Sequence, residues 1–425
     1  MKHKTNRLIA IIVVAACLVL ALFVALFLKQ SGYGWLRRDE RSGRQTREQP
    51  QPEVPFSVDE GGSWPMFRGG QQLLGRCSPP IGERWGKPHP TTTTLAESLV
   101  PVWKFKTHGE VKSSPVIDSG RVYVGSADAN VYAIDLASGD ELWSYRTDDR
   151  VEATPCALEG SVFIGSADAY LYALDAESGR LRWKYETGGE ILGAANWVKS
   201  PEGEQTWILV GSYDSKLHCV DAANGKAVWT YETESFVNGA PAVAEGLAVF
   251  GGCDARIHVV SLRDGSMQKQ IDTGSYVAAS AAFLQGQVYV GNYDSVLLKA
   301  DISSGQILWK YSSKDGAFFS SPAVGEDVVV LGGRDEHVHC VHRDNGKPVW
   351  TFQTLGQVDS SPVICGDKVL VGSEDGRVYM LRLSDGSKVW SYEIGEAVTS
   401  SAAVAGGMVV IGSDDGYVYA FASKQ

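Results

Sequence analysis

Residues 121–146 read RVYVGSADANVYAIDLASGDELWSYR, three short stretches of alternating apolar and polar residues separated by two glycine-containing turns. An alternation with a period of two predicts a β-strand. The stretches are Arg121–Ser126, Val131–Asp135 and Glu141–Arg146, and Ser113–Ile117 just upstream predicts a further strand. Four strands joined by tight turns predict one antiparallel meander.

The same pattern recurs along the chain, and each copy is marked by a glycine that precedes an aspartate by three residues. These glycines are Gly125, Gly165, Gly211, Gly251, Gly291, Gly332, Gly372 and Gly412, at intervals of 40, 46, 40, 40, 41, 40 and 40 residues. A fixed period near 40 indicates a repeat architecture, and four-stranded units of this length are typical of β-propeller blades. We therefore predict an all-β, eight-bladed β-propeller over residues 101–425.

A tryptophan on the fourth strand indicates how the ring closes. It follows the first glycine by eighteen residues in six units (Trp143, Trp183, Trp229, Trp309, Trp350 and Trp390), and Lys269 replaces it in the fourth unit. The eighth unit ends at Gln425 after three strands, whereas Trp103 lies in a strand-like stretch, residues 101–106, without a unit of its own. We predict that this stretch completes the eighth blade, which leaves no free blade edge. The tryptophans are expected to pack between blades rather than to bind a ligand, because each ring buries on the order of 150 Å².

The turn before the fourth strand carries a motif that points to a family. The first two units show it in full (Ala133, Asp135, Ser138, Gly139, Trp143; Ala173, Asp175, Ser178, Gly179, Trp183), and two others in part (Asp221, Gly225, Trp229; Ala300, Asp301, Gly305, Trp309). It resembles the tryptophan-docking motif of the propellers of pyrroloquinoline quinone (PQQ) enzymes, Ala-x-Asp-x-x-Thr-Gly-x-x-x-Trp. The lead-in residues 64–69, WPMFRG, resemble the same family, so that the resemblance covers residues 62–425. Later units depart from the motif, with His342, Arg382 and Ser261 in place of the aspartate.

The N-terminal region predicts a membrane anchor. After the basic segment 1–7, Leu8–Leu28 gives 21 uncharged residues, long enough to span a bilayer as one helix. Cys17 offers the alternative of a lipidated cysteine, but the apolar run continues for eleven residues beyond it. Residues 29–61 read as a flexible linker and 62–100 as a lead-in that packs on the propeller.

The sequence gives two opposing signals for the side of the membrane on which the propeller lies. Six basic residues follow the span (Lys29, Arg37, Arg38, Arg41, Arg44 and Arg47) and favour the cytoplasm by the positive-inside rule. The signal-like N-terminus and the family resemblance favour export. We expect a single-pass protein with an extracytoplasmic, periplasmic propeller.

Charge and cysteine content limit the function classes. The chain carries a net charge of −11, and because residues 1–60 hold nine Lys/Arg and six Asp/Glu, the remainder carries −14. An acidic domain is a poor nucleic-acid binder. Cysteines 156, 219, 340 and 365 fall on strands, where buried free thiols are expected, and whether Cys219 pairs with Cys253 on the next blade stays open.

The histidines read as structural. His218, His258 and His339 stand at the third-strand position that tyrosine fills in other units, so we interpret them as packing substitutes. His337 and His339 share one strand face and His342 lies on the other, which is a weak metal signal, and no metal site is predicted.

Candidate binding residues come from the positions where the repeat varies. Each innermost strand begins with small residues, as at Ser113 and Ser400, because eight strands converge there. The residue just before them differs from unit to unit, and the candidates from this rim are Lys112, Glu152, Asn238, Phe319, Asp359 and Thr399. We expect these residues to contact partners.

The resemblance implies two kinds of function. An active PQQ dehydrogenase adds a calcium ion, for which Glu152, Asn238 and Asp359 could supply oxygen ligands. However, the chain has no adjacent cysteine pair, and its loops add little beyond the blades, apart from an insertion near residues 199–205. It is also similar to the cofactor-free propeller lipoproteins of the outer-membrane β-barrel assembly machinery. We therefore expect a non-enzymatic scaffold for other envelope proteins without a cofactor, with a PQQ and calcium enzyme or a ligand-binding sensor ectodomain as alternatives.

Overall fold

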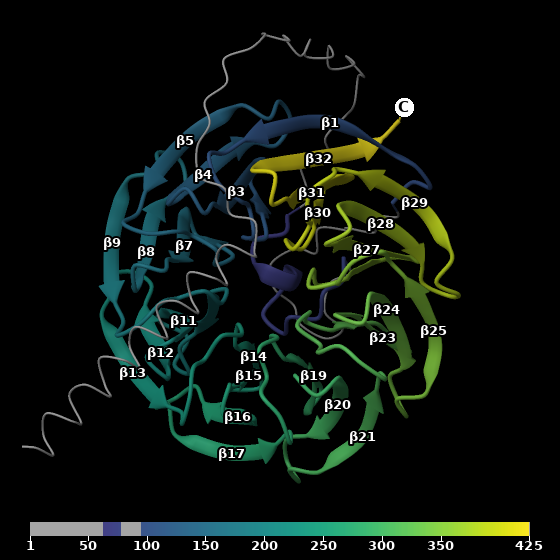
Figure 1. The fold of residues 1–425 in the computed structure, drawn as a ribbon. Coiled ribbons are helices and arrows are strands. Elements are labelled where there is room, and N and C mark those ends of the chain that lie inside the picture. Colours follow the sequence, from purple (N-terminus) through teal and green to yellow (C-terminus); the bar gives the residue numbers. More distant parts are fainter. Residues whose placement is uncertain (1–62, 78–94, 425) are drawn as a thin grey trace, which may run out of the picture. The chain divides into compact units, whose positions relative to one another are not determined.

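The computed structural model describes residues 63–77 and 95–424, and residues 95–424 form eight four-stranded antiparallel sheets arranged as a ring (Figure 1). The predicted eight-bladed propeller is thus confirmed. The predicted span 8–28, Cys17 and the linker 29–61 lie outside the described residues. Within the described residues, no helix has the length and apolar character needed to cross a membrane.

Each of the first seven blades is built from four consecutive strands, innermost first. Blades 1 to 4 consist of β2 (Val116–Asp118), β3 (Arg121–Gly125), β4 (Asn130–Asp135), β5 (Glu141–Arg146); β6 (Cys156–Leu158), β7 (Ser161–Gly165), β8 (Tyr170–Asp175), β9 (Leu181–Glu186); β10 (Asn196–Lys199), β11 (Thr206–Ser212), β12 (Lys216–Asp221), β13 (Ala227–Glu232); and β14 (Ala242–Ala244), β15 (Leu247–Gly251), β16 (Arg256–Ser261), β17 (Met267–Asp272). Blades 5 to 7 consist of β18 (Ala282–Leu284), β19 (Gln287–Gly291), β20 (Val296–Asp301), β21 (Ile307–Ser312); β22 (Ala323–Val324), β23 (Val328–Gly333), β24 (His337–His342), β25 (Pro348–Gln353); and β26 (Val363–Cys365), β27 (Lys368–Ser373), β28 (Arg377–Arg382), β29 (Lys388–Glu393).

The eighth blade is closed by the N-terminal strand, as the sequence predicts. It contains β30 (Ala403–Ala405), β31 (Met408–Gly412), β32 (Tyr417–Ser423) and, outermost, β1 (Leu99–Lys106). The register runs from Leu99 opposite Ser423 to Lys106 opposite Tyr417. Both ends of the propeller chain therefore lie in one sheet (Figure 1).

Burial follows the position of a strand within its blade. Second and third strands are almost wholly buried, as in β7, because both of their faces meet neighbouring blades. Fourth strands alternate instead, as in β5, where Trp143 is buried and its neighbours are exposed. This pattern is what a half-buried strand at the perimeter requires.

Small residues at the inner ends of the blades form a hydrogen-bonded belt rather than strands. The backbone amides of Ser280, Ser321, Ser361 and Ser401 each donate to the hydroxyl of the equivalent serine one blade further on, at 2.9–3.0 Å. The last of these bonds, from Ser401 to Ser114, links blade 8 to blade 1. Side chains of this size are needed because a neighbouring backbone approaches closely.

A strap, residues 63–77, crosses the inner ends of the blades; it is drawn purple in the middle of the ring (Figure 1). It contains one short 3-10 helix, η1 (Phe67–Gly69). The strap exchanges backbone hydrogen bonds with blades 1, 2, 4, 5, 6 and 7, from the Trp64–Ile117 bridge to the bond between Cys77 and Ile364. The bonds reach the innermost strands themselves, so the strap lies toward the end of those strands away from Lys112 and its equivalents.

The cysteine predictions need one correction. Cys365 is not a free thiol, because it forms a disulfide with Cys77 of the strap, with Cα atoms 4.9 Å apart. The sequence interpretation considered only cysteines within the repeats and so missed this partner. Cys156, Cys219 and Cys340 are free and buried, and Cys253 is free as well, so Cys219 and Cys253 do not pair.

Candidate functional site

The candidate site is the rim face, the end of the ring where each chain segment enters an innermost strand. Three positions per repeat meet there. The amide of the residue two after the first glycine donates to the carbonyl two residues before the variable rim position, as in Ala127 to Glu110 and Arg334 to Ala317, in all eight blades. This repeated bond fixes the backbone, so that only the side chains at these positions differ between blades.

The predicted rim residues lie at this face, and four of them form an ion pair or a hydrogen bond with a nearby residue. Lys112 pairs with Glu110 at 2.7 Å, and Glu152 pairs with Arg150 at 3.2 Å. The Asn238 side chain accepts from the Tyr213 hydroxyl at 3.1 Å and donates to the carbonyl of Ala278 at 3.1 Å. Thr399 donates to the Asp414 carboxylate at 3.1 Å.

Phe319 and Asp359 meet through a residue that the sequence analysis did not single out. The Arg334 guanidinium lies 3.6 Å from the centroid of the Phe319 ring. The same guanidinium binds both oxygens of Asp359, at 2.9 and 2.6 Å. Stacking on an aromatic face and a bidentate carboxylate bond are the two interactions that arginine makes best.

Phe319 also belongs to an arc of aromatic side chains whose four other members the sequence analysis did not single out. Tyr213 stacks on Phe236 with centroids 4.8 Å apart and planes 6° from parallel, and Tyr293 lies 6.2 Å from Tyr276 and 4.6 Å from Phe319. Phe236, Tyr276 and Tyr293 are 47, 57 and 47% exposed, unusually high for such large side chains. The signal was available in the sequence, since Phe236 and Tyr276 replace the Glu110 and Arg150 of other units.

Carboxylates dominate the other sector of the rim. Burial and the neighbouring Asp359 raise the pKa of Glu374, and burial raises the pKa of Asp414, with Glu110 and Glu152 adding to the effect. Of the charged residues at the three rim positions, six are acidic (Glu110, Glu152, Glu190, Asp359, Glu374 and Asp414) and three are basic (Lys112, Arg150 and Arg334). The rim face is therefore aromatic over blades 3 to 6 and acidic around the remainder.

The oxygens expected from the family resemblance to bind calcium do not form a cation site. Both oxygens of Asp359 are bound to Arg334, and the Asn238 oxygen accepts from Tyr213. Among the described residues, no group of three or more histidine, cysteine or acidic side chains is arranged to hold a metal.

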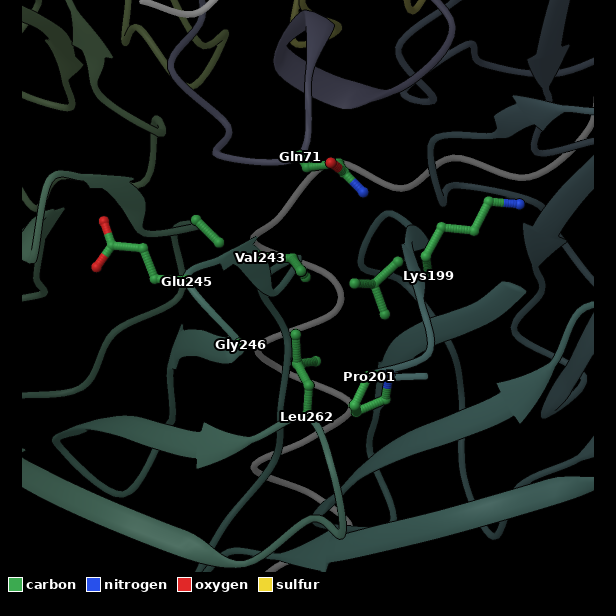
Figure 2. Close-up of a pocket in the computed structure, with 9 residues that line it drawn as sticks. Gln71, Lys199, Pro201, Val243, Glu245, Gly246 and Leu262 are labelled. Carbon is green, nitrogen blue, oxygen red and sulfur yellow. The ribbon is translucent and has the colours of Figure 1, made fainter. Parts of the chain in front are cut away.

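A cavity of about 210 Å³ lies elsewhere, between blades 3 and 4 beside the strap. Its walls are Val198, Pro201, Val243 and Leu262, and Gln71 of the strap lies at its edge (Figure 2). The charged ends of Lys199 and Glu245 point away from the cavity (Figure 2), and Lys199 is bonded to Glu159 and Thr206 instead. An apolar pocket without a converging polar group offers packing space and no catalytic chemistry.

Comparison with family models identifies the propeller. A model described as the β-propeller of the β-alanine-activating enzyme matches residues 194–425, more than half of the chain. The chain belongs to this propeller family. A second model, described as the outer membrane protein assembly factor BamB, matches residues 96–201. No curated protein sequence matches the chain.

Solved structures show the same fold at low sequence identity. BamB from Moraxella catarrhalis is 20% identical, with a TM-score of 0.66, and the match covers 77% of this chain and all of that one. The computationally designed Ika8 protein is 17% identical over 75% and 98% of the two chains, with a TM-score of 0.67. Quinohemoprotein alcohol dehydrogenase from Comamonas testosteroni is 13% identical over 84% and 80%, with a TM-score of 0.70. An outer membrane protein assembly factor and an alcohol dehydrogenase thus share this fold, so the fold alone does not determine the function.

Proposed function

We propose that this protein is a non-enzymatic, membrane-anchored scaffold that binds other envelope proteins through its rim face. One observation carries the proposal: the rim face varies from blade to blade and exposes large aromatic side chains, whereas the second and third strands keep the same buried pattern in every blade. Exposed aromatic clusters on a rigid framework are typical of protein interfaces. The BamB match adds a role in outer-membrane protein assembly as the specific form of the proposal.

The disulfide supports an extracytoplasmic propeller. Cys77 and Cys365 are joined, and disulfides persist in oxidising compartments such as the periplasm and are rare in the cytosol. This argues against the cytoplasmic placement that the basic residues after the predicted span favour.

Photocrosslinking in intact membranes tests the scaffold. A photoreactive amino acid at position 236, on the rim face, is expected to give a specific adduct with one envelope protein. The matched control is the same amino acid at position 142, because Leu142 is 44% exposed on the outer strand of blade 1. Equal adducts from both positions, or none from position 236, contradict the proposal.

The enzyme alternative has its own test. The purified full-length chain in detergent is mixed with PQQ and calcium, and quinone absorbance and dye-linked alcohol oxidation are followed. Quinone binding together with alcohol oxidation would show that the protein is a dehydrogenase and would overturn the scaffold proposal. We expect neither, because the oxygens of Asp359 and Asn238 are already engaged by protein groups.

A further inference from the structure

We propose that the rim face binds a partner segment carrying both aromatic and cationic side chains, with the aromatic groups on the arc and the cationic groups on the acidic sector. This inference rests on the proposed scaffold function and names the chemistry of the partner. The arc is Tyr213, Phe236, Tyr276, Tyr293 and Phe319. The acidic sector is Glu110, Glu152, Glu190, Asp359, Glu374 and Asp414.

The arc consists of two clusters of aromatic rings on neighbouring blades. The Tyr213 and Phe236 rings are stacked, and Tyr293 contacts both Tyr276 and Phe319 edge to face. Tyr213 and Tyr293 occupy the same repeat position, two residues after the first glycine of their units. Aromatic residues of this kind supply most of the binding energy at interfaces because they bury much area at small entropic cost.

The acidic sector lies on the same face, because its six carboxylates occupy the same three repeat positions as the aromatic residues. The three rim bases are already paired: Lys112 with Glu110, Arg150 with Glu152 and Glu190, and Arg334 with Asp359. Six carboxylates against three bases leave the rim with an excess of negative charge. Carboxylates whose protonation is favoured by their neighbours gain most from a cation supplied by a partner.

Charge complementarity therefore selects the occupant. A neutral glycan would stack on the tyrosines but leave the excess carboxylates uncompensated, and an acidic peptide would be repelled. A segment alternating aromatic residues with lysine or arginine satisfies both sectors, and cations also bind favourably over exposed tyrosine rings. The juxtaposition of the two sectors on one face is what distinguishes this site from an ordinary apolar patch.

Binding of three synthetic peptides to the purified full-length chain tests the inference. The first alternates tryptophan and phenylalanine with lysine and arginine, the second has glutamate at the basic positions, and the third has serine at the aromatic positions. We expect the first to bind at least tenfold more tightly than either of the others, and to weaken as salt is raised. A chitin oligosaccharide is included as a neutral stacking ligand.

Variants locate the binding. Tyr276→Ala with Tyr293→Ala should weaken binding about tenfold or more, and Glu374→Gln with Asp414→Asn should weaken it severalfold and flatten the salt dependence. Met267→Ala is the matched control, because Met267 is as exposed as Tyr276, at 57%, but lies on the outer strand of blade 4. Equal binding of the acidic peptide, preference for the oligosaccharide, or loss of binding in the control overturns the inference. If these peptides fail while position 236 still crosslinks, the scaffold stands and only the partner chemistry is wrong.

Discussion

In seven of the eight blades, one third-strand position forms the same hydrogen bond with either a tyrosine or a histidine, and in blade 5 this position is Leu298. In four blades a tyrosine hydroxyl donates to the aspartate of the Gly-x-x-Asp turn, as from Tyr172 to Asp168 at 2.7 Å. In three blades a histidine replaces it: His258 Nε2 lies 3.0 Å from Asp254, and its Nδ1 lies 3.0 Å from the hydroxyl of Tyr231, on the fourth strand of the preceding blade. These histidines are buried and hydrogen-bonded on both ring nitrogens, so they are not free to bind a metal.

The histidine blades make stability depend on pH. Burial lowers the pKa of His218 and of His258 from 6.5. A histidine with a lowered folded-state pKa binds fewer protons than in the unfolded chain, so its contribution to stability is present above pH 6.5 and is lost as the pH falls toward the folded-state pKa. We therefore expect the midpoint of urea denaturation to move to lower urea concentration as the pH is lowered from 7.5 to 5.5.

The control for this pH dependence uses the chain's own alternative. His218→Tyr and His258→Tyr insert the residue that the equivalent position carries in blades 1, 2, 7 and 8. The double variant should lose less stability over the same pH range than the unaltered protein, since carboxylates titrate in both. Identical pH profiles for the two proteins contradict the assignment.

At the scale of the element, neighbouring blades are joined where the fourth-strand tryptophan of one blade packs against the turn glycine of the next. The Trp143 ring packs on Gly179 of the next blade, and its Nε1 donates to the carbonyl of Ala176 at 3.1 Å. A side chain at Gly179 would lie 2.6 Å from that ring. The first glycine of each unit acts differently: Gly125 ends β3 and makes room for Val151 of the next blade, while the left-handed turn residue is Ala129.

Substitutions at two equivalent glycines distinguish the cost of a clash with tryptophan from the cost of backbone strain. Gly265 and Gly305 have φ values of +73° and +77°, so alanine costs each about 1–2 kcal/mol of backbone strain. An added Cβ lies 2.7 Å from the Trp229 ring at Gly265, but 3.1 Å from the flexible Lys269 side chain at Gly305. We expect Gly265→Ala to lower the free energy of unfolding by about 1–3 kcal/mol more than Gly305→Ala, as measured by urea denaturation. If the two variants lose the same free energy of unfolding, backbone strain alone explains why glycine recurs at this turn.

The same comparison shows what the sequence could predict. Fourth-strand and turn positions follow from a local period, so the strand Glu141–Arg146 is predicted to the residue. The rim candidates were found because they vary against that period. Arg334 and four of the five arc residues were missed because the sequence does not show their contacts; the contact between Tyr293 and Phe319, for example, joins two neighbouring blades of the folded ring. The strap and its disulfide lie outside the repeat and leave no periodic signal.

At the scale of the whole molecule, the ring is fastened twice. β1 completes the eighth blade beside β32, and the strap bonds to six blades before its disulfide at Cys77. The strap also carries a cost, because Arg68 is buried, its side-chain nitrogens have no hydrogen-bond partner among the described residues, and burial lowers its pKa to about 9. Release of the strap would return this guanidinium to water, so its desolvation is a cost that the backbone bonds and the disulfide of the strap offset.

Breaking the disulfide should therefore loosen the strap and lower the stability of the ring. Cys77 and Cys365 are 288 residues apart, and the chain-entropy model assigns roughly 5–6 kcal/mol to closing a loop of that length. We expect a reductant, or Cys77→Ser, to lower the melting temperature by several degrees and to expose the strap to protease before the blades. Cys253→Ser is the control, since Cys253 is a free cysteine. An unchanged melting temperature and an uncut strap in the reduced protein would show that its backbone bonds to the blades suffice, and that the disulfide reports the compartment rather than holding the fold.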